Sequence, residues 1–354
     1  MKKLILGIET SCDETALALV EASGGLKAPK FKVLAHELTS QVKVHRPFGG
    51  VVPNLAKREH IKNLPILYGR VFGNRKRERA LWRKVDFISV TASGPGLEPA
   101  LWAGIEFAKE LAKNPPAGGK KPLTGASHLE GHLYSFLLPS KKAKCADPKT
   151  ALPAVTLSVS GGHTFLIHMK TLKEWKKLGE TVDDAAGEAF DKVARLLGLP
   201  YPGGPQLEKL ALDLPKGEAP SIAFPRPMIH AKNLNFSFSG LKTSVLYYLR
   251  DNPAANKANV AASFQKAAID VLVKKTADAA KTYRVKSIIL CGGVAANKLL
   301  RKELAEQARK LKKKFFVPDV IYNTDNAAMI AVAGYFSVLK KKSYKLVAQG
   351  NLSI

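Results

Sequence analysis

The sequence has 354 residues, of which 46% are hydrophobic and 24% are charged. This length and composition indicate a soluble globular protein that forms either one large bilobal unit or two domains, each able to bury a core. Lysine and arginine number 56 against 29 acidic residues, for a net charge of +27. Such an excess favours a polyanionic partner, nucleic acid first, although a salt-adapted surface or a lysine-biased proteome would give the same charge.

The cysteines and the opening residues point to a cytoplasmic protein. Cys12, Cys145 and Cys291 are odd in number and widely spaced, so neither a disulfide framework nor a thiolate metal site is expected, and a reducing cytosol fits. The first apolar run stops at Glu9, too short for a signal peptide. No stretch reaches about 18 apolar residues, so no membrane span is expected.

The chain opens with a predicted strand at residues 4–8, a polar turn at 11–14 and a returning strand at 15–20. An actin- or hexokinase-type ATPase begins in this way, with the backbone N–H groups and hydroxyls of the turn facing phosphates. The same pattern is also typical of an ordinary hairpin, so it does not decide the fold alone.

A helix is predicted from Pro53 to about Phe72. The next residues are densely basic and form either an RNA-facing stripe or a solvated helix face. The basic residues are Arg75, Lys76, Arg77, Arg79, Arg83 and Lys84. Beyond them, the pattern predicts a strand at 85–92, a tight turn at 93–97, a helix at 99–112 and a short strand at 123–126.

Two histidines, His128 and His132, stand four residues apart on a helix predicted from Ser127, its candidate N-cap, to about residue 138. This spacing places both imidazoles on one face, where both can bind one metal ion, although two surface histidines are the alternative. Glu130 lies midway between them and therefore points about 200° away. A zinc protease needs its glutamate directly after the first histidine, so hydrolysis is not expected here.

After residues 140–153, which we interpret as a linker between two lobes, the opening pattern repeats. A strand at 154–160, a turn at Gly161, Gly162 and His163, and a returning strand at 164–168 suggest an internally duplicated α/β protein. The two glycines lack Cβ atoms where a phosphate could approach backbone amides. A Gly-Gly pair in a hairpin is more often a simple turn.

The remaining elements complete the second half. Asp191 lies near the edge of the apolar side of a helix predicted at 183–197, where a carboxylate is either solvated or directed at a ligand hydroxyl. Asn297 ends a strand-to-helix turn at 291–297, and Asp325 opens a final apolar helix at 327–339. The other predictions are a rigid turn at 201–205, an aromatic-hydroxyl segment at 236–243, a helix at 260–283, a strand at 287–290, a basic helix at 298–314 and a strand at 317–322.

Taken in order, these motifs resemble those of the tRNA N6-adenosine threonylcarbamoyltransferase family, once named O-sialoglycoprotein endopeptidase, in its bacterial form. The resemblance covers about residues 4–339. It rests on residues 8–15, 49–53, 94–97, 128–132, 159–164, 183–192, 201–205, 236–243, 291–298 and 324–330.

The resemblance implies a duplicated actin/hexokinase-like ATPase fold with an active-site cleft between two lobes. The lobes would comprise residues 1–139 and 154–322, with 140–153 as linker and 323–354 returning to the first lobe. The implied reaction moves a threonylcarbamoyl group from threonylcarbamoyl-adenylate to N6 of adenosine 37 in ANN-decoding tRNAs and releases AMP. The implied partners are tRNA, an inactive paralogue of the same fold and a small ATPase.

The resemblance also implies site residues. A divalent metal, Fe2+ first and Zn2+ as the alternative, would be held by His128, His132 and Asp325. The adenylate would be held by Ser158, Val159, Ser160, Gly161, Gly162, Asp191, Gly204 and Asn297.

The chemistry of an activated mixed anhydride is compatible with these residues, because it requires no nucleophilic serine or cysteine. A Lewis-acid metal would polarise the carbonyl, and the amides of Gly161 and Gly162 would stabilise the leaving phosphate. No general base is assigned: His163 is a candidate by position, against a structural role, and Asp13 and Glu14 are candidates for orienting the metal or phosphate. The competing functions are a metal-dependent endopeptidase and a non-catalytic ATP-binding scaffold subunit.

Overall fold

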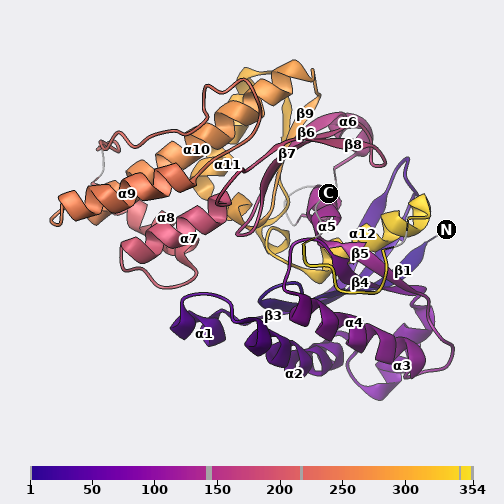
Figure 1. The fold of residues 1–354 in the computed structure, drawn as a ribbon. Coiled ribbons are helices and arrows are strands. Elements are labelled where there is room, and N and C mark those ends of the chain that lie inside the picture. The colour runs from indigo at the N-terminus through magenta and orange to yellow at the C-terminus, as the bar shows by residue number, and fades with distance from the viewer. Residues whose placement is uncertain (1, 141–145, 216–217, 343, 352–354) are drawn as a thin grey trace. The chain divides into compact units, whose positions relative to one another are not determined.

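The computed structural model describes residues 2–140, 146–215, 218–342 and 344–351, so Cys145 and part of the predicted linker lie outside the described residues. The chain forms two compact units, one of residues 1–150 and 318–354 and the other of residues 151–317 (Figure 1). None of the described helices is both long and apolar enough to cross a bilayer.

The first unit is built on a five-stranded sheet with the order β3-β2-β1-β4-β5. The strands are β1 (Lys3–Glu9), β2 (Glu14–Ser23), β3 (Lys30–Ser40), β4 (Phe87–Ser93) and β5 (Leu123–Ser127). β1, β2 and β3 pair antiparallel, whereas β4 and β5 run parallel to β1. The strands predicted at residues 4–8, 15–20, 85–92 and 123–126 are thereby confirmed, while β3, with its mixed burial, was not anticipated.

Helices cover both faces of this sheet. The helices of this unit are α1 (Val42–His45), α2 (Pro53–Phe72), α3 (Arg75–Lys84), α4 (Glu98–Lys113), α5 (His128–Tyr134), α6 (Pro148–Ala151, which ends in the second unit) and α12 (Ala327–Lys340). Of these, α2 and α4 pack on one face of the sheet and α12 packs on the other. Leu6 and Ile8 of β1 share a core with α2 and α4. The intervening Gly7 faces α12, where a Cβ would lie 2.1 Å from the Ala327 carbonyl oxygen. β1 is therefore buried on both faces, which explains its continuous apolar run.

The second unit repeats the topology with the order β10-β9-β6-β7-β8. Its strands are β6 (Ala154–Val159), β7 (Thr164–Met169), β8 (Trp175–Glu180), β9 (Ser287–Cys291) and β10 (Lys314–Phe316). β6, β7 and β8 pair antiparallel, whereas β9 and β10 run parallel to β6. If the strands of each unit are numbered 1 to 5 along the chain, and the second sheet is read from β8 to β10, both sheets have the order 3-2-1-4-5. This shared order confirms the duplication. The helices are α7 (Ala186–Leu196), α8 (Gly203–Ala211), α9 (Ser239–Asp251), α10 (Lys257–Thr282) and α11 (Lys298–Lys310).

The structure also corrects three predictions in the second half of the chain. The strand predicted at residues 317–322 is wrong: β10 ends at Phe316, Pro318 has no N–H to donate to a ladder, and Val320–Tyr322 form a 3-10 turn. The basic helix stops at Lys310 rather than 314, because Lys312 takes a positive φ of 55° before β10 pairs with β9. The rigid turn expected at 201–205 includes the first turn of α8, which begins at Gly203.

Candidate functional site

His128, His132 and Asp325 come together in the first unit, although they lie far apart in sequence. Both histidines are on α5, which begins directly after β5, and the Ser127 hydroxyl accepts a hydrogen bond from the Glu130 N–H at 3.4 Å as the predicted N-cap. Asp325 lies just before α12. Its Oδ1 atom is 3.3 Å from Nε2 of His128 and 3.2 Å from Nε2 of His132.

These three side chains fit a divalent metal ion. Their ligand atoms all lie within 4.8 Å of one another. Metal–ligand bonds of about 2.0–2.2 Å at tetrahedral or octahedral angles place neighbouring ligand atoms about 2.8–3.6 Å apart, which includes both measured separations. Two imidazole nitrogens and one carboxylate oxygen suit Fe2+ and Zn2+.

Glu9 and Ser11 support this cluster, a role that the sequence reasoning missed. Oε2 of the fully buried Glu9 lies 3.2 Å from Nδ1 of His128 and accepts a hydrogen bond from the Thr91 hydroxyl at 2.8 Å. The Ser11 hydroxyl lies 3.1 Å from the same Nδ1 and donates to Oδ2 of Asp325 at 3.4 Å. Such contacts orient a ligating imidazole. The available signal was a lone carboxylate at the end of a buried apolar strand.

Carboxylates crowd the neighbourhood of the cluster, while His128 and His132 lower the pKa of Asp325 itself to about 2 despite its burial. Burial, followed by Asp13 and Asp325, raises the pKa of the Glu14 carboxyl well above its ordinary value. Burial opposes protonation of His128, but the Asp325 and Glu9 carboxylates outweigh it and raise the pKa of that imidazole. A bound cation would offset the mutual repulsion of these carboxylates.

Glu130 points away from the cluster, as its helical position predicted. Its Oε1 accepts a hydrogen bond from the Tyr344 hydroxyl at 2.8 Å and lies 3.3 Å from Nζ of Lys342. Its Oε2 lies 3.7 Å from Nζ of Lys340. A glutamate held by the C-terminal segment does not serve a metal-bound water, so this geometry does not support the endopeptidase.

In the second unit, the Gly-Gly turn after β6 is held by hydrogen bonds between the residues on either side of the two glycines. The Ser160 N–H donates to the His163 carbonyl at 2.8 Å, and the His163 N–H donates to the Ser160 hydroxyl at 3.1 Å. A Cβ on Gly161 or Gly162 would meet nothing within 4 Å. The turn therefore leaves open space beside both glycines, into which a ligand could come close to the main chain.

The other expected adenylate residues lie around the same edge of the sheet. Ser158 pairs with Cys291 across the parallel strands β6 and β9, so the turns that follow both strands are neighbours. Gly292, at φ 91°, passes so close that a Cβ would lie 2.4 Å from the Val159 carbonyl oxygen. The Ser160 carbonyl accepts from the Gly187 N–H at the start of α7. The carboxyl ends of parallel strands are where α/β sheets bind ligands.

Asp191 and Asn297 each organise a helix start at this edge. Oδ1 of Asp191 accepts hydrogen bonds from the N–H groups of Gly203 and Gly204 at 2.8 and 2.9 Å, at the beginning of α8. Asn297 caps α11 through the Leu300 N–H at 2.9 Å, and its amide group donates to Gln265 at 2.8 Å. Both side chains thus have structural contacts, and a role toward a nucleotide would be added to these.

Both described cysteines, Cys12 and Cys291, have thiols whose pKa is raised. Burial raises the pKa of the Cys291 thiol to about 12. Burial and the neighbouring Asp13 carboxylate raise the pKa of the Cys12 thiol as well. Thiols that stay protonated react poorly, which agrees with a reaction on an already activated substrate.

Comparison with known proteins identifies the family. The family model described as tRNA N6-adenosine threonylcarbamoyltransferase matches residues 32–332, a range that contains every expected metal and adenylate residue. A relative of that name from Thermosipho melanesiensis is 46% identical over 332 residues, 94% of each chain. Another from Thermotoga neapolitana is 43% identical over 352 residues, 99% of each chain.

A solved structure supports the fold. The crystal structure of T. kodakarensis HypF superposes with a TM-score of 0.56 at 13% identity, covering 96% of this chain and 48% of HypF. At that identity the likeness concerns the fold alone, which is the duplicated actin/hexokinase-like ATPase fold. On the match of its sequence over residues 32–332 and on these near full-length relatives, the chain belongs to the tRNA N6-adenosine threonylcarbamoyltransferase family.

Proposed function

We propose that this protein transfers the threonylcarbamoyl group from threonylcarbamoyl-adenylate to N6 of adenosine 37 in ANN-decoding tRNAs and releases AMP. The observation that carries the proposal is the family match over residues 32–332, with relatives of the same name along nearly the whole chain. The cluster of His128, His132 and Asp325 within that range supports it further.

A divalent metal, Fe2+ first and Zn2+ as the alternative, would be held by Nε2 of His128, Nε2 of His132 and Oδ1 of Asp325. The distances of 3.3 and 3.2 Å from Oδ1 of Asp325 to Nε2 of His128 and to Nε2 of His132 support this assignment. When bound, the metal would supply Lewis acidity for a carbonyl or phosphoryl oxygen. Glu9 holds His128 from behind through Nδ1, which leaves Nε2 to face the ion.

The adenylate would lie at the carboxyl edge of the second sheet, against Ser158, Val159, Ser160, Gly161, Gly162, Asp191, Gly204 and Asn297. The open space at both turn glycines supports a close approach of the phosphate to the main chain. N6 attacks the carbonyl carbon of the mixed anhydride, the bond from that carbon to the phosphate oxygen breaks, AMP takes the electron pair, and N6 loses a proton. His163, by its place beside the turn, is the candidate acceptor of that proton.

The setting of the reaction follows from the family resemblance. We propose a cytoplasmic location and work beside an inactive paralogue of the same fold and a small ATPase. The same proposal divides the chain into lobes at residues 1–139 and 154–322, with 140–153 as linker and 323–354 returning to the first lobe. It also gives Asp13 and Glu14 a part in orienting the metal or the phosphate.

A transfer assay tests the function. Purified protein is mixed with threonylcarbamoyl-adenylate and an unmodified ANN-decoding tRNA, with and without candidate partners, and the digested tRNA is assayed for the modified nucleoside by mass spectrometry. His128→Ala and Asp325→Ala should abolish the product, while the exposed Glu106→Gln on α4 should retain it. Absence of product with folded, metal-loaded protein under every partner condition would favour the non-catalytic scaffold instead.

A further inference from the structure

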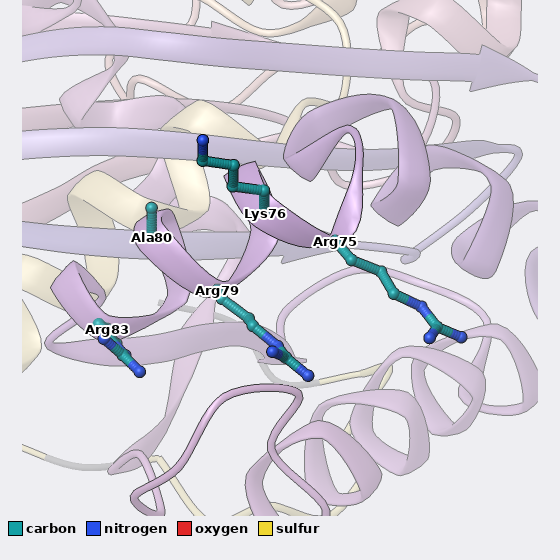
Figure 2. Close-up of a pocket in the computed structure, with 5 residues that line it drawn as sticks. All are labelled: Arg75, Lys76, Arg79, Ala80 and Arg83. Atoms are coloured by element: carbon teal, nitrogen blue, oxygen red, sulfur yellow. The ribbon is translucent and has the colours of Figure 1, made fainter.

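Helix α3 carries a row of arginines with no acidic partner among the described residues. Arg75, Arg79 and Arg83 recur every four residues, so they fall within an arc of about 80° and span about 12 Å along the helix. All three are exposed, and the ion pairs of the described chain include none of them. Figure 2 shows the three side chains leaving the helix on the same side.

The row borders a hollow of about 500 Å³ lined by Arg75, Lys76, Arg79, Ala80 and Arg83. Four of these five residues are cationic, and a fifth cation lies near the end of the helix, where Nζ of Lys121 donates to the Arg83 carbonyl at 3.3 Å. A concentration of cations around a hollow without a carboxylate costs electrostatic free energy in the absence of an anion. The arrangement therefore suits a ligand that brings several negative charges.

The rest of α3 holds this row in place. Trp82 is fully buried and its ring lies 6.0 Å from that of Phe72, while Asn74 caps the helix through the Arg77 N–H at 3.0 Å. The single acid of the helix, Glu78, sits beside Tyr68, where burial and this carboxylate raise the pKa of the Tyr68 hydroxyl. Glu78 thus lies against the packed side of the helix, and the arginines are presented on a firmly anchored element.

We propose that the arginine row of α3, formed by Arg75, Arg79 and Arg83, binds the phosphodiester backbone of the tRNA substrate outside the reaction site. The inference rests on the proposed function for the identity of the RNA. In duplex DNA one strand carries a phosphate about every 3.4 Å of axis, so a row about 12 Å long runs beside about three to four phosphate intervals, enough for each of its three guanidinium groups to meet a phosphate. Guanidinium groups match phosphate geometry, and contacts of this kind position a nucleic acid without reading its sequence.

The test compares three variants with the wild-type protein. The triple Arg75→Gln, Arg79→Gln, Arg83→Gln removes the row while keeping good helix formers on an exposed face. The matching triple Arg→Lys keeps the charge. A charge-matched control, Lys173→Gln, Lys176→Gln, Lys281→Gln, removes three exposed cations of the second unit that form no ion pair within the described part of the chain.

The readout is the Kd for an ANN-decoding tRNA transcript at several salt concentrations. The Gln triple should weaken binding about tenfold or more at about 0.1 M salt and reduce the slope of log K against log salt by about 2–3, at 0.7–0.9 per phosphate. The Lys triple should keep most of the affinity, and the control triple should change Kd less than about twofold. In the transfer assay the Gln triple should raise KM for tRNA and leave kcat unchanged, because α3 supplies none of the proposed site residues.

A Kd and salt slope of the Gln triple that match those of the wild type, with an unchanged melting temperature, would overturn the inference. An equal loss of tRNA affinity in the control triple would overturn it too, because the loss would then be caused by the lower total positive charge rather than by the removal of this row. Failure of the proposed function is a separate outcome: wild-type protein would form no modified nucleoside, whatever the tRNA affinities of the variants.

Discussion

Replacement of Glu9 by glutamine should weaken metal binding although Glu9 itself is not a proposed ligand. The carboxylate is fully buried, and its Oε2 lies 3.2 Å from Nδ1 of His128. When Nε2 of His128 binds a metal, Nδ1 carries a proton, and a carboxylate accepts that proton's hydrogen bond more strongly than a neutral amide does. Glutamine keeps the size of the side chain and removes the charge. Because Glu9 also accepts hydrogen bonds from the Thr91 hydroxyl and the Ser11 N–H, the melting temperature of the variant is measured alongside its metal affinity.

Loss of such an outer contact lowers metal affinity by about 10–100-fold, or about 1.4–2.7 kcal/mol at 1.36 kcal/mol per decade. The assay is titration of the metal-free protein with Zn2+ or, without oxygen, Fe2+, in competition with a chelator of known affinity. The control is Glu106→Gln, which removes an exposed carboxylate of the same unit and should leave the affinity unchanged. A Glu9→Gln protein with unchanged melting temperature and an affinity within about twofold of the wild type would refute the reasoning.

Three further outcomes are expected. Metal at about 100 times its Kd should stabilise the wild-type protein by about 2.7 kcal/mol in a melting experiment, and a variant lacking either histidine of the cluster should show no such rise. Gly292→Ala should destabilise the second unit by about 1–3 kcal/mol in thermal unfolding, because φ is 91° and the new Cβ would lie 2.4 Å from a carbonyl oxygen, whereas Gly293→Ala, with open space around it, should not. Asp184 lies 2.8 Å from both Lys192 and Lys242, and these lysines lower its pKa despite its burial. The ionised Asp184 carboxylate therefore stabilises the folded protein above its unfolded pKa of about 3.9, and this stabilisation is lost as pH falls through the lower folded pKa. Asp184→Asn should accordingly make the free energy of unfolding depend less on pH in that range. A pH dependence equal to that of the wild type would contradict this.

The candidate site shows where sequence reasoning stopped. The spacing of His128 and His132 predicts a shared face, and the structure has them on one helix with rings 4.7 Å apart. Asp325 was assigned to the cluster through the family resemblance, because no local pattern connects it to residues 193 positions away. Glu9 was missed for the same reason: its partner His128 is 119 residues distant and only the pairing of strands brings them together.

Contiguous signals in the sequence are sufficient to predict many of the helices and strands. The apolar run of β1, the proline-led start of α2, the buried helix α12 and the repeated strand-turn-strand order all follow from local periodicity and turn residues. The ordered motifs were also sufficient for the family. The edge strands β3 and β8 were not predicted, because a strand with one side in solvent has a weak apolar pattern. In the structure these strands form by pairing with β2 and β7.

Which side chains face one another depends on how the folded chain packs. It turns Glu130 toward Tyr344 and Lys342, sets Asp191 against two N–H groups of α8, and leaves the arginines of α3 around a hollow without a described carboxylate. These relations depend on contacts between segments far apart in sequence, which are selected by burial and packing of the whole unit. Periodicity places a residue on a face of its own helix or strand, but the partner on that face comes from elsewhere in the chain.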